Sequence, residues 1–163
     1  MIKGDDRMIR KATMADAERV NELRKTVNDI HVEGRPDIFK PGFGQEIRDH
    51  VMNYIDQENN EILLSEQNGE IRGMMMLDWI DRPENAYNLA RKFCHVAEIA
   101  VDERFRRMGV GKELMEGAKA ECRKRGVRRI ELDVWAFNDA LAFYEAEGFT
   151  VFRRFMEYEI DEA

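Results

Sequence analysis

The stretch that decides the fold of this chain spans residues 96–112 and reads VAEIAVDERFRRMGVGK. A short apolar run stops at a charged turn, and two glycines spaced one residue apart, Gly109 and Gly111, then open a strongly helical segment. Such a junction points several free backbone N–H groups, and the positive end of a helix dipole, at one place. Because neither glycine carries a Cβ atom, the backbone can approach a bound anion closely. The segment therefore predicts a binding site for a phosphate or pyrophosphate.

The spacing inside this turn resembles the acyl-CoA signature of the GNAT superfamily of N-acetyltransferases. That signature is Arg or Gln, two residues, Gly, one residue, then Gly or Ala, and residues 106–111 read RRMGVG. Two other glycine-rich motifs fit worse, because the segment contains neither G-x-G-x-x-G nor G-x-x-x-x-G-K-[ST]. Taken alone, the six residues also fit an ordinary strand–turn–helix with glycines for steric relief.

A second stretch, residues 138–149, resembles the other hallmark of the same family. It reads NDALAFYEAEGF: an Asn, an alanine-bearing helix, then Phe-Tyr-x-x-x-Gly-Phe. Two signatures in the right order, separated by one helix and one strand, are far more specific than either alone. The chain is therefore identified as similar to GNAT N-acetyltransferases over nearly its whole length.

Hydrophobic periodicity and turn residues give the expected elements. Strands are expected over 8–12, 62–64, 71–80, 95–101, 127–135 and 149–160, and helices over 14–28, 45–56, 110–125 and 139–147. Asn68-Gly69 predicts a hairpin turn, while residues 81–92 fit either a long loop or a hairpin tip. The order β-α-α-β-β-β-α-β-α-β predicts an α/β (α+β) fold. It is a single-domain, GNAT-like mixed and mostly antiparallel sheet, flanked by helices on both faces.

Size and composition exclude several classes of protein. A chain of 163 residues predicts one domain over 1–163, with 1–7 as a disordered leader. A net charge of −7 disfavours a nucleic-acid partner, and no apolar stretch predicts a membrane span or a signal peptide. Cys94 and Cys122 are expected to be free thiols, and no Cys/His cluster has metal-ligand spacing. We therefore expect a cytoplasmic protein without a metal, and the sequence admits a homodimer.

The resemblance implies acetyl-CoA as cosubstrate and a primary amine as acceptor, on a small molecule, a protein N-terminus or a lysine. It places the cofactor against the residues Ile99, Ala100, Val101, Arg106, Arg107, Met108, Gly109, Val110, Gly111, Lys112, Asn138 and Tyr144. In the family the matching Tyr protonates the departing thiolate, so Tyr144 is expected to be catalytic. The alternative for Tyr144 is a core residue with a bonded hydroxyl, and Asn138 also fits a helix cap.

Three side chains are candidates for the general base, and water is a fourth. Glu98 comes first and Asp133 second, while His95 has the ordinary pKa best suited to the task. Side chains alternate along a strand, so His95 and Glu98 should not share a face unless a bulge intervenes. Each carboxylate could instead be a surface charge or part of a structural ion pair.

The acceptor is expected to lie against the variable segments. The predicted substrate-binding residues are His31, Asp37, Phe39 and Trp79, where a carboxylate could hold an amine and aromatic rings could flank it. Some of these side chains could equally serve only to pack the loop. A function of another class also fits: a non-catalytic acyl-CoA-binding or regulatory module on the same fold.

Overall fold

The computed structural model describes residues 6–160. Its elements are β1 (Arg7–Lys11), α1 (Ala17–Gly34), α2 (Gln45–Ile55), β2 (Asn60–Gln67), β3 (Glu70–Arg82), β4 (Arg91–Val101), α3 (Val110–Arg125), β5 (Ile130–Glu131) and α4 (Ala140–Ala146), with short 3₁₀ turns at Met14–Asp16 and Glu103–Phe105. The chain divides into two compact units, one ending at Asp133 and the other starting at Val134.

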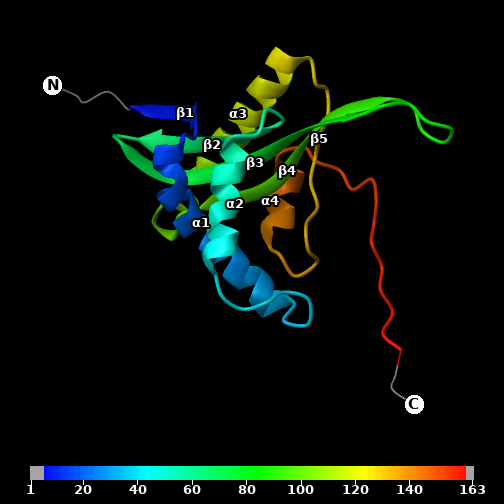
Figure 1. The fold of residues 1–163 in the computed structure, drawn as a ribbon, viewed down its shortest axis with the longest axis horizontal. Coiled ribbons are helices and arrows are strands. Elements are labelled where there is room, and N and C mark those ends of the chain that lie inside the picture. Colours follow the sequence, from blue (N-terminus) through cyan, green and yellow to red (C-terminus); the bar gives the residue numbers. More distant parts are fainter. Residues whose placement is uncertain (1–5, 161–163) are drawn as a thin grey trace. The chain divides into compact units, whose positions relative to one another are not determined.

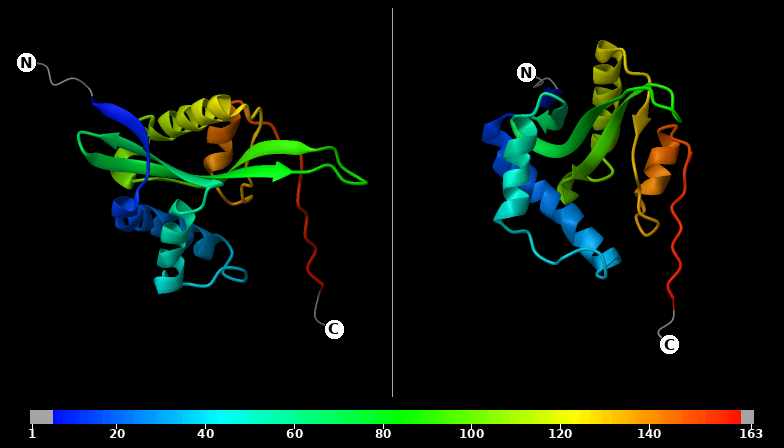
Figure 2. Two further views of the ribbon diagram at one scale, coloured as in Figure 1. Left: turned by 45° about the horizontal axis from the view of Figure 1, so that its top comes forward. Right: turned by 45° about the vertical axis from the view of Figure 1, so that its right-hand side comes forward.

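The first unit is a five-stranded sheet in the order β1-β2-β3-β4-β5. Its first four strands are antiparallel, whereas β5 runs parallel to β4. Helices α1 and α2 cover one face of the sheet, and α3 covers the other (Figures 1 and 2). The expected mixed, mostly antiparallel α/β fold with helices on both faces is confirmed.

Two turns join the long strands. Asn68 and Gly69 both have positive φ, 53° and 81°, as the type I′ turn of a two-residue hairpin requires. Between β3 and β4, residues 83–90 form an exposed connection, so the segment 81–92 is a hairpin tip rather than a long loop. The β3–β4 hairpin projects beyond the other strands of the sheet, as Figure 1 and the left view of Figure 2 show.

The core lies on both faces of the sheet because the central residues of β2 and β3, Ile62–Leu64 and Met74–Leu77, are continuously apolar. On one face Ile62, Leu64, Met74 and Met76 pack with Val20, Leu23, Val51 and Tyr54 of α1 and α2. On the opposite face the alternate residues Leu63, Met75 and Leu77 are at most 2% exposed, beneath α3. The run Met74–Met76 therefore fills core on both sides of β3.

A capping box starts the 3₁₀ turn Met14–Asp16, which leads directly into α1. The Thr13 N–H donates to the Asp16 carboxylate at 2.8 Å, and Arg10 of β1 donates to the same carboxylate at 2.9 Å. These contacts lower the pKa of Asp16 to about 2, chiefly through the Arg10 hydrogen bond. The helix ends at Gly34, six residues beyond the expected end at 28, because the first helix breakers are Gly34 and Pro36.

Two strand predictions were wrong in extent. The expected strand 127–135 shrinks to Ile130–Glu131, and the expected strand 149–160 is absent, since residues 151–160 have no regular structure. Alternating apolar residues indicate a segment that can pack one face against a core. A strand forms only when a neighbouring strand hydrogen-bonds to its backbone N–H and C=O groups. Of the predicted leader, residues 1–5 lie outside the described residues, while Arg7 belongs to β1. Across residues 6–160, no helix has both the length and the apolar character that crossing a membrane requires.

Candidate functional site

The glycine turn lies between β4 and α3, and its backbone has the conformation that the sequence predicts. Arg107 and Gly109 both have positive φ, 62° and 82°, and Gly109 is the residue before the first residue of α3. The first helical hydrogen bond runs from the Glu113 N–H to the Gly109 carbonyl at 3.0 Å. The N–H groups of Val110, Gly111 and Lys112 therefore have no acceptor inside the helix. A Cβ at position 109 would meet nothing within 4 Å, so the space beside the turn is open.

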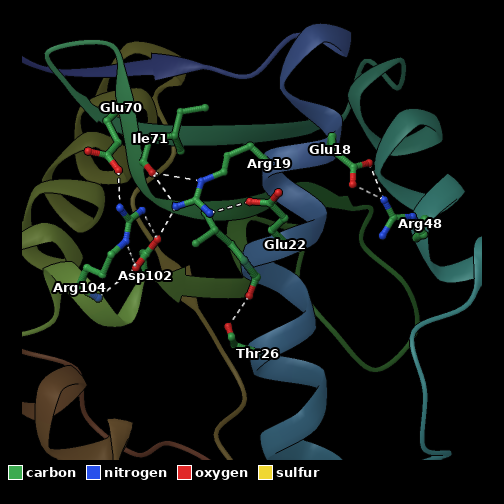
Figure 3. Close-up of polar contacts among 10 residues, drawn as sticks. Glu18, Arg19, Glu22, Thr26, Arg48, Glu70, Ile71, Asp102 and Arg104 are labelled. Atoms are coloured by element: carbon green, nitrogen blue, oxygen red, sulfur yellow. Dashed lines mark hydrogen bonds and ion pairs between the residues drawn. The ribbon is translucent and has the colours of Figure 1, made fainter.

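Ion pairs fix the base of this turn. Asp102, directly after β4, pairs with Arg19 of α1 and accepts from Arg104 at 2.8 Å (Figure 3). Arg104 also contacts Glu70 at 2.7 Å, so its charge is already engaged. Arg106 is 3.9 Å from Glu103, and within residues 6–160 no ion pair is recorded for Arg107 or Lys112. Arg106, Arg107 and Lys112 are thus the charges still available to an anion at the turn.

Strands β4 and β5 part just before this turn. Their parallel pairing covers only Cys94 with Ile130 and His95 with Glu131, whereas β4 continues to Val101. The β5-side edge of residues 96–101 therefore carries backbone N–H and C=O groups that no strand of the described chain pairs. Ile99, Ala100 and Val101, which were predicted to bind the cofactor, lie on this open edge.

A β-bulge at Ala97 changes which side chains share a face of β4. Val96 pairs with Leu77 and Glu98 pairs with Met76, which leaves Ala97 as the extra residue. His95 and Glu98 consequently both face α1 and α2, the case that the sequence allowed only if a bulge intervened.

A small cavity of about 70 Å³ lies on this face, next to Glu98. Its lining residues come from α1, the loop after it, α2 and β4: Arg24, Val27, Asn28, His31, Phe43, Ile47 and Glu98. The Arg24 Nε donates to Glu98 at 3.2 Å, and Arg24 is held by the Ile47 carbonyl at 2.9 Å. Burial raises the pKa of Glu98, and the Arg24 charge opposes that shift.

A second polar cluster centres on His95, whose side chain is 31% exposed. Its Nδ1 lies 3.2 Å from Oδ2 of Asp78 on β3, and the Tyr54 hydroxyl of α2 donates to the other Asp78 oxygen at 2.6 Å. Its Nε2 lies 3.6 Å from Asp133. The pKa of His95 is raised, first by the hydrogen bond to Asp78 and also by Asp133, against the effect of burial.

The predicted substrate residues are not all near the cavity. His31 lines it and stacks on Phe39 with ring centroids 5.1 Å apart. Asp37 is engaged by Arg35 at 2.7 Å. Trp79 lies beside Arg125 of α3, 4.3 Å from its guanidinium, and therefore on the opposite face of the sheet.

In the second unit, the predicted residues Asn138 and Tyr144 belong to the short helix α4 and its start. The side-chain Oδ1 of Asn138 accepts from the N–H of Ala140, the first residue of α4, at 2.9 Å, while the N-cap residue itself is Asp139. Tyr144 is buried, with its ring edge-on to Phe143 and Phe149, and burial raises the pKa of its hydroxyl.

Sequence reasoning missed Arg24, Tyr54 and Asp78. One signal was available for the first two: Arg24 follows Val20 by four residues, and Tyr54 follows Val51 by three, on the apolar face of each helix. A charged or hydroxyl group on such a face is buried and needs a partner. Asp78 had no comparable signal. In residues 6–160, no group of three His, Cys, Asp or Glu side chains could hold a metal ion.

Comparisons with known proteins agree with this geometry. Residues 24–149 match the sequence profile of the acetyltransferase (GNAT) family. A mutant of the BH1408 protein from Bacillus halodurans is 28% identical with a TM-score of 0.89, over 94% of this chain and 99% of that chain. AAC(6')-Iy in complex with a bisubstrate analogue of CoA and acetylneamine is 18% identical with a TM-score of 0.74, over 95% and 98%.

A third solved structure is an aminoglycoside acetyltransferase, meta-AAC0020 from an uncultured soil metagenomic sample, in complex with sisomicin. It is 15% identical with a TM-score of 0.68, over 96% of this chain and 97% of that chain. At such identities the last two structures show similarity of fold alone. No curated protein matches the sequence.

Proposed function

The chain belongs to the GNAT acetyltransferase family, and we propose that it transfers an acetyl group from acetyl-CoA to a primary amine by direct attack in a ternary complex. The observation that carries this proposal is the parting of β4 and β5 after the His95–Glu131 pair, directly upstream of the open glycine turn. One continuous segment thus offers an unpaired strand edge followed by an anion site, which suits a long polar arm that ends in a pyrophosphate.

In this proposal the turn binds the pyrophosphate of CoA. The free N–H groups at Val110, Gly111 and Lys112 and the dipole of the sixteen-residue helix α3 would stabilise its charge. Arg106 and Arg107 would add charge, with Met108 and Gly109 forming the turn itself. The pantetheine arm would lie along Ile99, Ala100 and Val101, and Asn138 would contact the arm.

The proposed chemistry needs no covalent enzyme intermediate. A main-chain N–H near Ile99 would polarise the thioester carbonyl, and binding both substrates in one site would supply proximity. Tyr144 would protonate the departing thiolate. Its hydroxyl carries a proton at neutral pH, as a proton donor must, and burial raises its pKa further. The proton of the acceptor ammonium would be taken up within the cluster of Glu98, His95 and Asp133.

We propose the cavity beside Glu98 as the entry of the acceptor amine. Glu98 supplies a negative charge, while His31 and Phe43 supply rings that can flank an aliphatic or aromatic amine. Phe39 would support the His31 ring. The exposed Asp37 and the opposite-face Trp79 have less support as substrate residues, because neither lines the cavity. Neither a metal nor nucleic acid has a role in this proposal, and the protein would act in the cytoplasm.

A homodimer is the proposed oligomeric state. Six large apolar side chains are more than half exposed in the last described segment: Val151, Phe152, Phe155, Met156, Tyr158 and Ile160. Strand β5 is the end of the sheet order, so a second copy can offer its free edge to this segment. At about 150–250 Å² per aromatic side chain, the three aromatic residues of two such segments would bury about 900–1,500 Å², which overlaps the size range of a standard interface.

The central experiment measures thiol release from acetyl-CoA with a panel of amines, alongside direct titration with CoA. The panel includes aminoglycosides, because two proteins of similar fold are shown with such acceptors or their analogues, and also polyamines, amino acids and peptides. Thiol release with at least one amine supports the enzyme. Tight CoA binding without release across the panel would favour the non-catalytic module, and no CoA binding would refute both.

A further inference from the structure

We propose that His95 accepts the proton that leaves the acceptor amine, and that Asp78 is the residue that positions His95 for this task. The inference rests on the proposed acetyl transfer. It assigns a role to a cluster that contains side chains from four places in the sequence: Tyr54 of α2, Asp78 of β3, His95 of β4 and Asp133 after β5.

The contacts of Asp78 orient the imidazole ring. Its Oδ2 accepts from the Nδ1–H of His95 at 3.2 Å, so in neutral His95 the lone pair is on Nε2. Its Oδ1 accepts from the Tyr54 hydroxyl at 2.6 Å, which holds the carboxylate in place. Nε2 then faces Asp133, on the side of β4 where β5 begins to part. The basic nitrogen is thereby held at the point where the open strand edge begins.

Burial raises the pKa of Glu98, but the buried charge of Arg24 opposes that shift and favours the carboxylate. The Glu98 carboxylate accepts from Arg24, whose residue is only 8% exposed and is anchored by the Ile47 carbonyl. Protonating Glu98 would leave that buried guanidinium without a counter-charge, and an unpaired buried charge is costly. We therefore assign Glu98 the role of attracting the ammonium group while it stays ionised.

His95, unlike Glu98, is stabilised by its neighbours when it takes up a proton. Protonation places its positive charge between two carboxylates, Asp78 and Asp133, so both stabilise the imidazolium. The side chain of Asp133 is 72% exposed, which gives the proton a route to water. The other ionisable groups around the cluster are Tyr54 and His50 of α2, with Glu98 and Arg24 beyond them. Burial lowers the pKa of His50, which disfavours a second positive charge beside His95.

In the proposed acetyl transfer, proton transfers accompany the formation of the C–N bond and the cleavage of the C–S bond. The ammonium gives one proton to Nε2 of His95 and becomes a neutral amine. Its nitrogen attacks the thioester carbonyl carbon, so that a C–N bond forms. The nitrogen of the tetrahedral intermediate loses its second proton to water, the intermediate collapses, the C–S bond breaks, and the thiolate takes a proton from Tyr144. Water then returns a proton to the Tyr144 oxygen. His95 releases its proton to water past Asp133. The products are an amide, CoA thiol and one proton in solution.

The test compares pH profiles of kcat/KM for the full-length protein, Asp78→Asn and the control Asp81→Asn. Asp81 is on the same strand and, among residues 6–160, its ion pair is with the exposed Lys92, so its variant should behave like the wild type. Asp78 favours the charged imidazole, so Asp78→Asn should lower the pKa of His95 and move the ascending limb to lower pH. It should also lower the plateau roughly 10- to 100-fold, because a weaker and less ordered base remains.

A structural role alone would not move the ascending limb. If Asp78→Asn is folded and the ascending limb of its kcat/KM pH profile coincides with that of the wild type, Asp78 does not position His95. His95→Gln provides a second variant should Asp78→Asn not fold, and it should remove the limb altogether. A limb that persists in His95→Gln would overturn the assignment and point to Glu98.

An NMR titration of the His95 ring separates this inference from the proposed function. If the wild type releases no thiol with any amine, acetyl transfer fails as a proposal, while the ring titration still tests the positioning. A His95 pKa that is above the ordinary value in the wild type and lower in Asp78→Asn supports the contact. Equal values in the two proteins would refute it.

Discussion

Replacing Gly73 with alanine should destabilise the protein and weaken CoA binding together. Gly73 lies on β3 beneath the first turn of α3. A Cβ added there would be 2.9 Å from the Ala100 carbonyl oxygen, 2.9 Å from Val110 Cγ1 and 3.3 Å from Leu114 Cδ1. The first contact is a neighbouring strand's backbone and the second a stiff β-branched side chain, so neither can give way cheaply.

The expected magnitude follows from these contacts. Overpacking a tight core costs about 1–3 kcal/mol, and the lower unfolded-state entropy of alanine offsets about 0.4–1 kcal/mol. The free energy of unfolding should therefore fall by about 1–2 kcal/mol, which corresponds to roughly 2–8 °C in Tm for a chain of this size. Val110, the first residue of α3, must shift to make room for the new methyl group. The N–H groups of the proposed pyrophosphate site at this helix start should be displaced with it, which should weaken CoA binding.

Urea unfolding gives the stability, and titration calorimetry gives the CoA affinity of the folded variant. Gly44→Ala is the matched control, because a Cβ at position 44 meets nothing within 4 Å. A Gly73→Ala variant as stable as the control would refute the argument that the layers are closely packed here. A destabilised variant with unchanged CoA affinity would show that the turn is not coupled to this packing.

Three further predictions concern other parts of the chain. Gly109→Glu should abolish CoA binding in a titration, because the turn is open and the new charge repels the pyrophosphate. The φ of 82° strains a side chain at this position, so the free energy of unfolding should fall as well, and circular dichroism checks that the variant is folded; normal affinity in the folded variant would make the turn purely structural. Tyr144→Phe should lower turnover about 10²-fold with little change in CoA affinity, whereas unchanged kinetics would make Tyr144 a core residue. Asp16→Asn should lower the free energy of unfolding by about 2 kcal/mol at pH 7. Since the folded pKa of Asp16 is lowered to about 2, that difference should vanish as the pH falls from about 4 to 2, and a pH-independent difference would contradict it.

The parts of the fold that the sequence predicted well are those encoded locally. The Asn68-Gly69 hairpin needs only two residues that accept positive φ, and α3 ends at Arg125 because Gly126, its C-cap, also has positive φ. The glycine turn likewise depends on spacing within six residues. Such features can be identified before any tertiary contact is known.

The features that were missed depend on contacts between distant parts of the chain. Arg24 meets Glu98 across 74 residues, and Tyr54 meets Asp78 across 24. The strands predicted over 127–135 and 149–160 were too long for a related reason. The alternation of apolar side chains was visible in the sequence, but strand pairing also requires a neighbouring backbone. No pattern in one sequence reveals which neighbour is present.

The bulge at Ala97 shows how one residue can serve two parts of the proposed site. Without the extra residue, normal alternation would put His95 and Glu98 on opposite faces of β4, and one of them would point toward α3. With it, both point toward α1 and α2, where Arg24 and Asp78 fix them. The bulge lies directly after the last β4–β5 pair, where the edge of β4 becomes free to bind an extended ligand such as the proposed pantetheine arm. A bulge at this point therefore brings the ionisable side chains and the open backbone edge to one place on a single strand.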